Sequence, residues 1–154
     1  MLSVGNTAPS FSLPDQVGTM HSLEQYHGKW VILYLYPKDD TTGCTKEACG
    51  FRDAHTEFEN KGIVILGLSK DSVKSHGKFA SKYALNFPIL SDESTETIKA
   101  YESFGQKKFM GRTYMGTFRN TFLINPQGKL AKVYENVNPL THPEHMLQDI
   151  KNLS

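Results

Sequence analysis

The chain carries two cysteines, Cys44 and Cys49, within the polar segment YPKDDTTGCTKEACG of residues 36–50. Two thiols five positions apart can act as metal ligands, as a structural disulfide, as a redox pair, or as small buried apolar side chains. Two cysteines in 154 residues are too few for the disulfide framework of a secreted protein. We expect a cytoplasmic protein, and in that reducing compartment a cysteine pair more often serves catalysis or metal binding.

The two cysteines fall in a segment, residues 43–60, that is predicted to form a helix. Its apolar stripe at helical spacing consists of Cys44, Ala48, Phe51 and Phe58. Cys44 therefore faces the core in the first turn, and Cys49 lies about 140° around the helix, with about 8.7 Å between the two Cα atoms. Because a disulfide needs Cα atoms within about 7 Å, the pair can bridge only if at least one helical turn unwinds.

The first turn of a helix favours a reactive thiol. Unpaired backbone N–H groups and the positive end of the helix dipole both stabilise thiolate, the nucleophilic form. Asp39 and Asp40 oppose that effect unless they point to solvent. Thr41 or Thr42 can cap the helix, or a threonine hydroxyl can donate to the sulfur or to a bound oxygen atom. Arg119 stands at the start of an apolar strand, where an unpaired guanidinium is costly to bury, so it is a candidate cationic partner.

The rest of the chain predicts the elements that position this helix. We expect buried strands at 30–36 and 63–69, helices at 73–83, 94–103 and 143–153, an edge segment at 87–90, and a hairpin of 121–124 with 129–137. A short extended or hairpin segment precedes them, with a helical turn opened by a capping box at Ser22–Gln25. This order predicts an α/β sandwich with a mixed sheet, which the thioredoxin-like arrangement satisfies, in a single domain over residues 1–154.

Composition excludes several classes of function. The net charge is +1 without a dense basic run, so we expect no nucleic-acid partner. The longest apolar run, residues 30–36, is far too short to span a bilayer, and the N-terminus lacks the regions of a signal peptide, so we expect no membrane association. The segment GQKKFMGRT at 105–113 lacks the lysine of a phosphate loop. No metal, flavin, haem or nucleotide signature is present, and we expect no cofactor.

The segment from Pro37 to Cys44, PKDDTTGC, contains the Pro-x-x-x-Thr-x-x-Cys pattern and resembles the peroxiredoxins, thiol peroxidases on a thioredoxin-like fold. The five-residue step to Cys49 resembles their peroxiredoxin Q subgroup, also called bacterioferritin comigratory protein. The similar segments are APSFSLPDQ, WVILYLYPKDDTTGCT, ACGFRD, LNFPILSDE, KKFMGRTYMGTFRNTFLI and GKLAKVYENV. One departure is Thr42, where relatives often have proline, which leaves the loop less rigid.

The resemblance implies a thioredoxin-like fold with a central mixed sheet flanked by helices and an N-terminal extension. It implies that Cys44 attacks hydrogen peroxide or an organic hydroperoxide, and that Cys49 resolves the sulfenic acid as an intramolecular disulfide. Thr41 would hydrogen-bond the peroxide, Pro37 would shield the pocket, and Arg119 would stabilise the thiolate and the breaking O–O bond. Thioredoxin or a glutaredoxin-like dithiol would restore both thiols.

Three alternatives remain open from the residues alone. A zinc site would need His55, or His142 and His145, beside the cysteines, although we expect the last two to be solvated. A thioredoxin-type reductase would need Cys-x-x-Cys, which is absent. A chaperone or interaction protein would leave the cysteines incidental. We expect a monomer, with a weak homodimer as the alternative; the apolar residues at 109–110 and 114–115 either line the rim of the active site or form a self-association patch.

Overall fold

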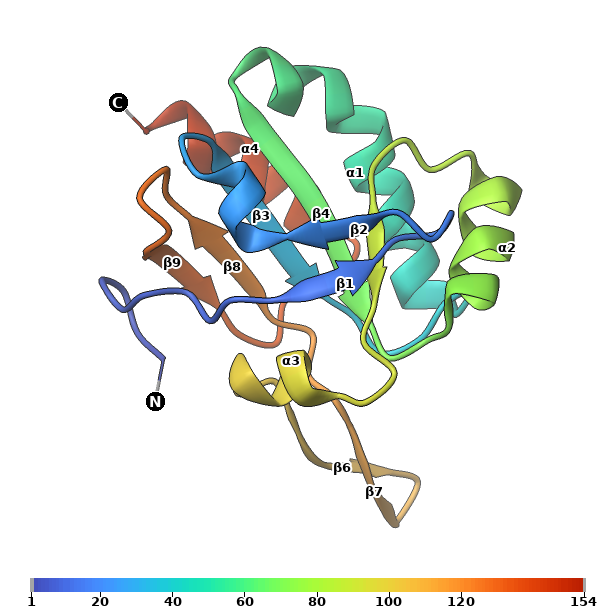
Figure 1. Cartoon of the computed structure of the whole chain (residues 1–154). Coiled ribbons are helices and arrows are strands. Elements are labelled where there is room, and N and C mark those ends of the chain that lie inside the picture. The colour runs from blue at the N-terminus through green and yellow to red at the C-terminus, as the bar shows by residue number, and fades with distance from the viewer. Residues whose placement is uncertain (1, 154) are drawn as a thin grey trace.

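A five-stranded mixed sheet forms the centre of the computed structural model, which describes residues 2–153 (Figure 1). Its strands, in spatial order, are β5 (Ile89–Ser91), β4 (Ile63–Ser69), β3 (Trp30–Leu35), β8 (Thr121–Ile124) and β9 (Leu130–Tyr134). The first three are parallel, whereas β8 and β9 pair antiparallel. This confirms the predicted thioredoxin-like arrangement, with the 87–90 region at one edge of the sheet and the late hairpin at the other.

Helices cover one face of the sheet, and shorter elements cover the other (Figure 1). The first face carries α1 (Thr42–Asn60), α2 (Val73–Tyr83) and α4 (His142–Lys151). The second carries β1 (Ser12–Pro14), β2 (Met20–Ser22), the 3-10 turn η1 (Leu23–Tyr26) and α3 (Glu96–Ala100). The β1–β2 hairpin is the predicted N-terminal extension. Within the described residues, no helix combines the length and apolarity needed to cross a membrane.

Strand β3 is buried on both faces, as its continuous apolar sequence predicts. Alternate side chains, such as Ile32 and Tyr34, pack under α1, α2 and α4. The intervening Val31, Leu33 and Leu35 pack beneath η1 and α3. The strand is therefore fixed in register, and the loop that follows it starts from a rigid position.

Two regions differ from the sequence expectations. The expected helix at 94–103 is only α3, Glu96–Ala100, because Thr95 and Glu102 on either side adopt left-handed backbone angles. Residues 104–117 form an unpredicted hairpin of β6 (Phe104–Phe109) and β7 (Arg112–Thr117), which projects from the body (Figure 1). Its turn uses positive φ at both Met110 and Gly111, a conformation that a methionine seldom adopts and that the sequence did not signal.

Candidate active site

The loop between β3 and α1 presents an uncapped helix start. Asp40 adopts a left-handed conformation (φ 58°), which turns the chain into α1. Thr41 is the N-cap residue, but its hydroxyl donates to the backbone oxygen of Lys38 at 2.9 Å and makes no cap bond. The first turn also contains no acidic side chain. The positive end of the α1 dipole is therefore left without a neutralising group from its own first turn.

Cys44 lies in this first turn and is 1% exposed. The Nη2 atom of Arg119 donates to its Sγ atom at 3.4 Å. Arg119 follows β7 and precedes β8, and its backbone oxygen accepts a hydrogen bond from the Val137 N–H at 2.9 Å. A Cβ atom on Gly43 would lie 3.2 Å from the same Nη2 atom, so the glycine leaves room for the guanidinium. The fold thus places a permanent cation against the buried sulfur, a contact that favours thiolate.

Glu47, one turn after Cys44, is the partner of Arg119 that the sequence analysis missed. Its Oε1 atom accepts from Arg119 Nη1 at 2.9 Å, and the side chain is fully buried. Burial raises the pKa of Glu47 to about 7, and Arg119 only partly opposes that effect. The second carboxylate oxygen, Oε2, has no partner among the described residues. The available signal was a glutamate placed beside the predicted apolar stripe, three positions from the cysteine.

Arg119 is therefore one cation shared by two acids. Burial lowers the pKa of its guanidinium, but Cys44 and Glu47 outweigh burial, and the net shift is upward. The pKa of Glu47 is raised because full burial outweighs a single ion pair, which satisfies only one of the two carboxylate oxygens. Protonating Glu47 would leave the guanidinium charge to the sulfur, so the state of this carboxyl affects how strongly Arg119 stabilises the thiolate.

The two aspartates of the loop each have partners outside the first turn of α1. Asp39 is buried, and its carboxylate accepts hydrogen bonds from Tyr36 and from residues of α2. Asp40 accepts from Lys82 Nζ at 2.8 Å and from the Tyr83 hydroxyl at 2.7 Å. Both carboxylates therefore accept hydrogen bonds from donors of the protein itself.

Cys49 lies in the same continuous helix, half-buried, and both cysteines are free thiols. The helical separation calculated from the sequence therefore holds in this structure, and a bridge requires unwinding. The adjacent Gly50 contacts α4, where an added Cβ would meet Pro143 at 2.8 Å. Pro37 is half-buried in the loop after β3. The structure thus brings Cys44 and Arg119 together and holds Cys49, Thr41 and Pro37 on the same loop and helix.

The histidines do not form a zinc site with the cysteines. His142 is buried, which corrects the expectation that it is solvated, and its Nε2 atom lies 2.9 Å from Thr121 Oγ1. Burial lowers the pKa of His142 to about 4, so the ring is neutral at pH 7. His145 is exposed, as expected. Among residues 2–153, the one group of side chains close enough to share a metal ion includes neither cysteine.

Comparison with known proteins agrees with this geometry. The AhpC/TSA family model matches residues 4–133. Peroxiredoxin Bcp of Bacillus subtilis is 41% identical over 153 residues, covering 99% of this chain and 98% of the relative. Peroxiredoxin Bcp of Escherichia coli is 41% identical over 150 residues, covering 97% and 96%.

Solved structures share the fold over nearly the whole chain. A cysteine-to-serine mutant of Xylella fastidiosa PrxQ has a TM-score of 0.93 at 32% identity, covering 98% of this chain and 96% of that one. The Xanthomonas campestris bacterioferritin comigratory protein, whose alkyl peroxide reduction activity has been studied, has a TM-score of 0.88 at 34% identity and the same coverage. The buried thiol, its arginine and these matches together show that the chain belongs to the AhpC/TSA family, as a peroxiredoxin of the Bcp/peroxiredoxin Q group.

Proposed function

We propose that this thiol peroxidase uses Cys44 as its nucleophile and Cys49 as its resolving thiol, within one thioredoxin-like domain over residues 1–154. The observation that supports this most is the Arg119 Nη2 contact with the buried Cys44 sulfur, 3.4 Å long. Peroxide cleavage needs a thiolate and donors aimed at the oxygen that becomes negative, and the guanidinium beside the buried sulfur supports both requirements.

In the first step the Cys44 thiolate attacks one oxygen of the peroxide. An S–O bond forms, the O–O bond breaks, and the leaving oxygen takes a proton and departs as water or alcohol. Arg119 stabilises the charge on that oxygen. Thr41 orders the loop through its bond to Lys38, and its hydroxyl is released to the peroxide if that bond opens. Pro37, half-buried in the same loop, shields the pocket.

In the second step the Cys49 thiol condenses with the Cys44 sulfenic acid, forming a disulfide and water. The first turns of α1 must unwind for this, since both cysteines lie in one continuous helix. A dithiol donor of the thioredoxin or glutaredoxin kind then reduces the disulfide by exchange. Such a cycle needs a reducing compartment, so we place the protein in the cytoplasm, acting as a monomer on hydrogen peroxide and organic hydroperoxides.

The test is mass spectrometry of intact protein and of non-reduced peptides after one equivalent of hydrogen peroxide. Wild type should rapidly lose two hydrogen atoms and yield a peptide pair linked through Cys44 and Cys49. The Cys49→Ser variant should instead give a trappable sulfenic acid at Cys44. A reaction as slow as that of an ordinary free thiol would refute the role of Cys44, and a disulfide between molecules would refute the role of Cys49.

A further inference from the structure

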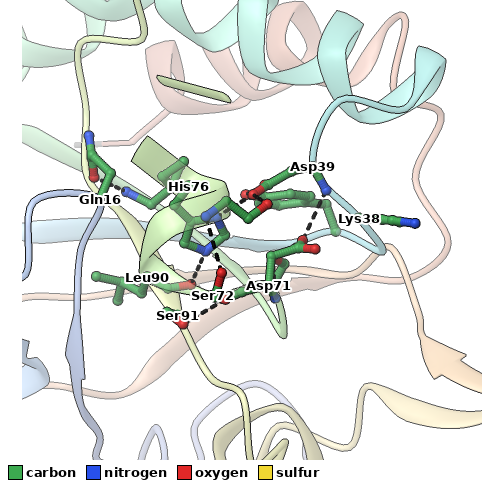
Figure 2. A network of polar contacts seen from close by, with 12 residues as sticks. Gln16, Lys38, Asp39, Asp71, Ser72, His76, Leu90 and Ser91 are labelled. Atoms are coloured by element: carbon green, nitrogen blue, oxygen red, sulfur yellow. Dashed lines mark hydrogen bonds and ion pairs between the residues drawn. The ribbon is translucent and has the colours of Figure 1, made fainter. Parts of the chain in front are cut away.

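A buried polar network fastens the loop that precedes α1 to the neighbouring elements (Figure 2). The Asp39 carboxylate accepts from the Tyr36 hydroxyl at 2.6 Å and from Ser75 Oγ at 2.7 Å, and it lies 2.7 Å from His76 Nδ1. The backbone N–H of Asp39 donates to Asp71 Oδ2 at 2.9 Å. One residue of the loop is therefore held by the end of β3, by α2 and by the segment between β4 and α2.

Both ring nitrogens of His76 have partners in this network. Its Nε2 atom lies 2.9 Å from the backbone oxygen of Leu90, which can only accept, so this nitrogen carries a proton. The Nδ1 atom shares a hydrogen bond with the Asp39 carboxyl group, which also accepts from two hydroxyls. Asp39 and His76 thus form a buried hydrogen-bonded pair, with side chains only 4% and 0% exposed.

The network is closed and leaves no free ligand set for a metal ion. Asp39, Asp71 and His76 lie close enough to share a cation. However, both His76 nitrogens are occupied, and Asp71 Oδ2 accepts from the Ser69 hydroxyl at 2.6 Å as well as from Asp39. In this structure the polar atoms of the cluster therefore join segments of the chain to one another.

None of these contacts involves the residues that must unwind. The polar network holds Asp39, whereas the proposed disulfide requires movement between Thr42 and Cys49. The first turns of α1 can therefore open while the loop before them keeps its position.

We propose that the buried Asp39–His76 pair is a latch that positions the start of α1 over Arg119 and sets the balance between the helical and unwound states. This inference rests on the proposed roles of Cys44 and Cys49. With the latch in place the helix re-forms from a fixed start, which favours attack on peroxide. Without it the loop loosens, attack slows, and the sulfenic acid passes more readily to Cys49.

The same loop offers a matched control on its exposed side. Lys82 Nζ lies 2.8 Å from Asp40 Oδ2, with side chains 59% and 43% exposed. Both pairs join this loop to α2, but exposed pairs contribute little to stability, whereas breaking a buried pair is costly. His76→Gln and Lys82→Gln therefore remove the same kind of link in different surroundings.

The experiment measures two quantities in each variant. The first is the second-order rate at which the Cys44 thiol disappears with peroxide. The second is the ratio of Cys44 sulfinic acid to Cys44–Cys49 disulfide at high peroxide. For His76→Gln we expect the attack rate to fall about tenfold or more, because reacting groups lose their alignment, and the sulfinic fraction to fall as well. Lys82→Gln should stay within about twofold of wild type in both.

Asp39→Asn provides a second variant if His76→Gln does not fold, because an amide keeps neutral hydrogen bonds to Tyr36 and to a neutral imidazole. It should shift both quantities in the same direction by a smaller factor. If a folded Asp39 or His76 variant matches Lys82→Gln in both, with only a lower melting temperature, the latch is overturned. A wild type that does not react with peroxide would overturn the role of Cys44 itself, which is a distinguishable result.

Discussion

The pKa of Glu47 leads to a quantitative prediction about stability. Its carboxyl is fully buried and its pKa is raised from 4.5 to about 7, chiefly by burial. Because the folded pKa exceeds the unfolded one, the folded protein binds more protons between these values, and its stability falls as pH rises through the window. Glu47→Gln removes that titration, so the variant should gain stability relative to wild type as pH increases.

The magnitude follows from the two pKa values. Ionising a group that titrates at 4.5 when unfolded and at about 7 when folded lowers the free energy of unfolding by about 2 kcal/mol between roughly pH 5 and 7.5. The difference between variant and wild type should change by that amount across this range. Solvent screening does not reduce the effect, since the side chain is not exposed.

Urea unfolding of the reduced proteins at several pH values measures this difference. Glu57→Gln is the matched control, because Glu57 lies on the same helix but is exposed, and its difference from wild type should not depend on pH in this way. A Glu47→Gln difference that stays constant with pH would show that the Arg119 ion pair fully compensates for burial. A difference that changes in the opposite direction would refute the reasoning outright.

Three other substitutions near the thiol have expected outcomes of their own. Arg119→Met should slow peroxide attack about 10²-fold, measured by thiol loss, whereas the exposed Arg112→Met should not. Thr42→Pro should stabilise the reduced protein by about 0.5–1 kcal/mol, since Thr41 before it is already extended; destabilisation in urea would contradict this. The free energy of unfolding of wild type should fall by about 3 kcal/mol as the pH drops from about 6.5 to 4. The cause is His142, whose pKa in the folded protein, about 4, lies below its usual value. The His142→Asn variant should not show this fall when unfolding is measured at several acidic pH values. If its stability depends on pH as that of wild type does, the role given to His142 is wrong.

Local pattern was enough to predict the helix that carries the thiols. Cys44, Ala48, Phe51 and Phe58 are all buried, as their spacing requires, because helical periodicity depends only on neighbours along the chain. The same reasoning missed the β6–β7 hairpin. That hairpin turns at Met110 and Gly111, and local preference gives no reason to place a methionine at positive φ.

The charges around the sulfur depend on contacts between distant segments, and here the sequence was insufficient. Three acids lie near Cys44 in the chain, and nothing local distinguishes Asp39 and Asp40 from Glu47. The structure separates them through partners far along the sequence. His76, 37 positions from Asp39, is a partner of that carboxyl group, whereas Arg119, 72 positions from Glu47, contacts both Glu47 and the sulfur. The surroundings of Cys44 therefore depend on which partner the tertiary fold supplies to each acid as much as on the cation that it places against the sulfur.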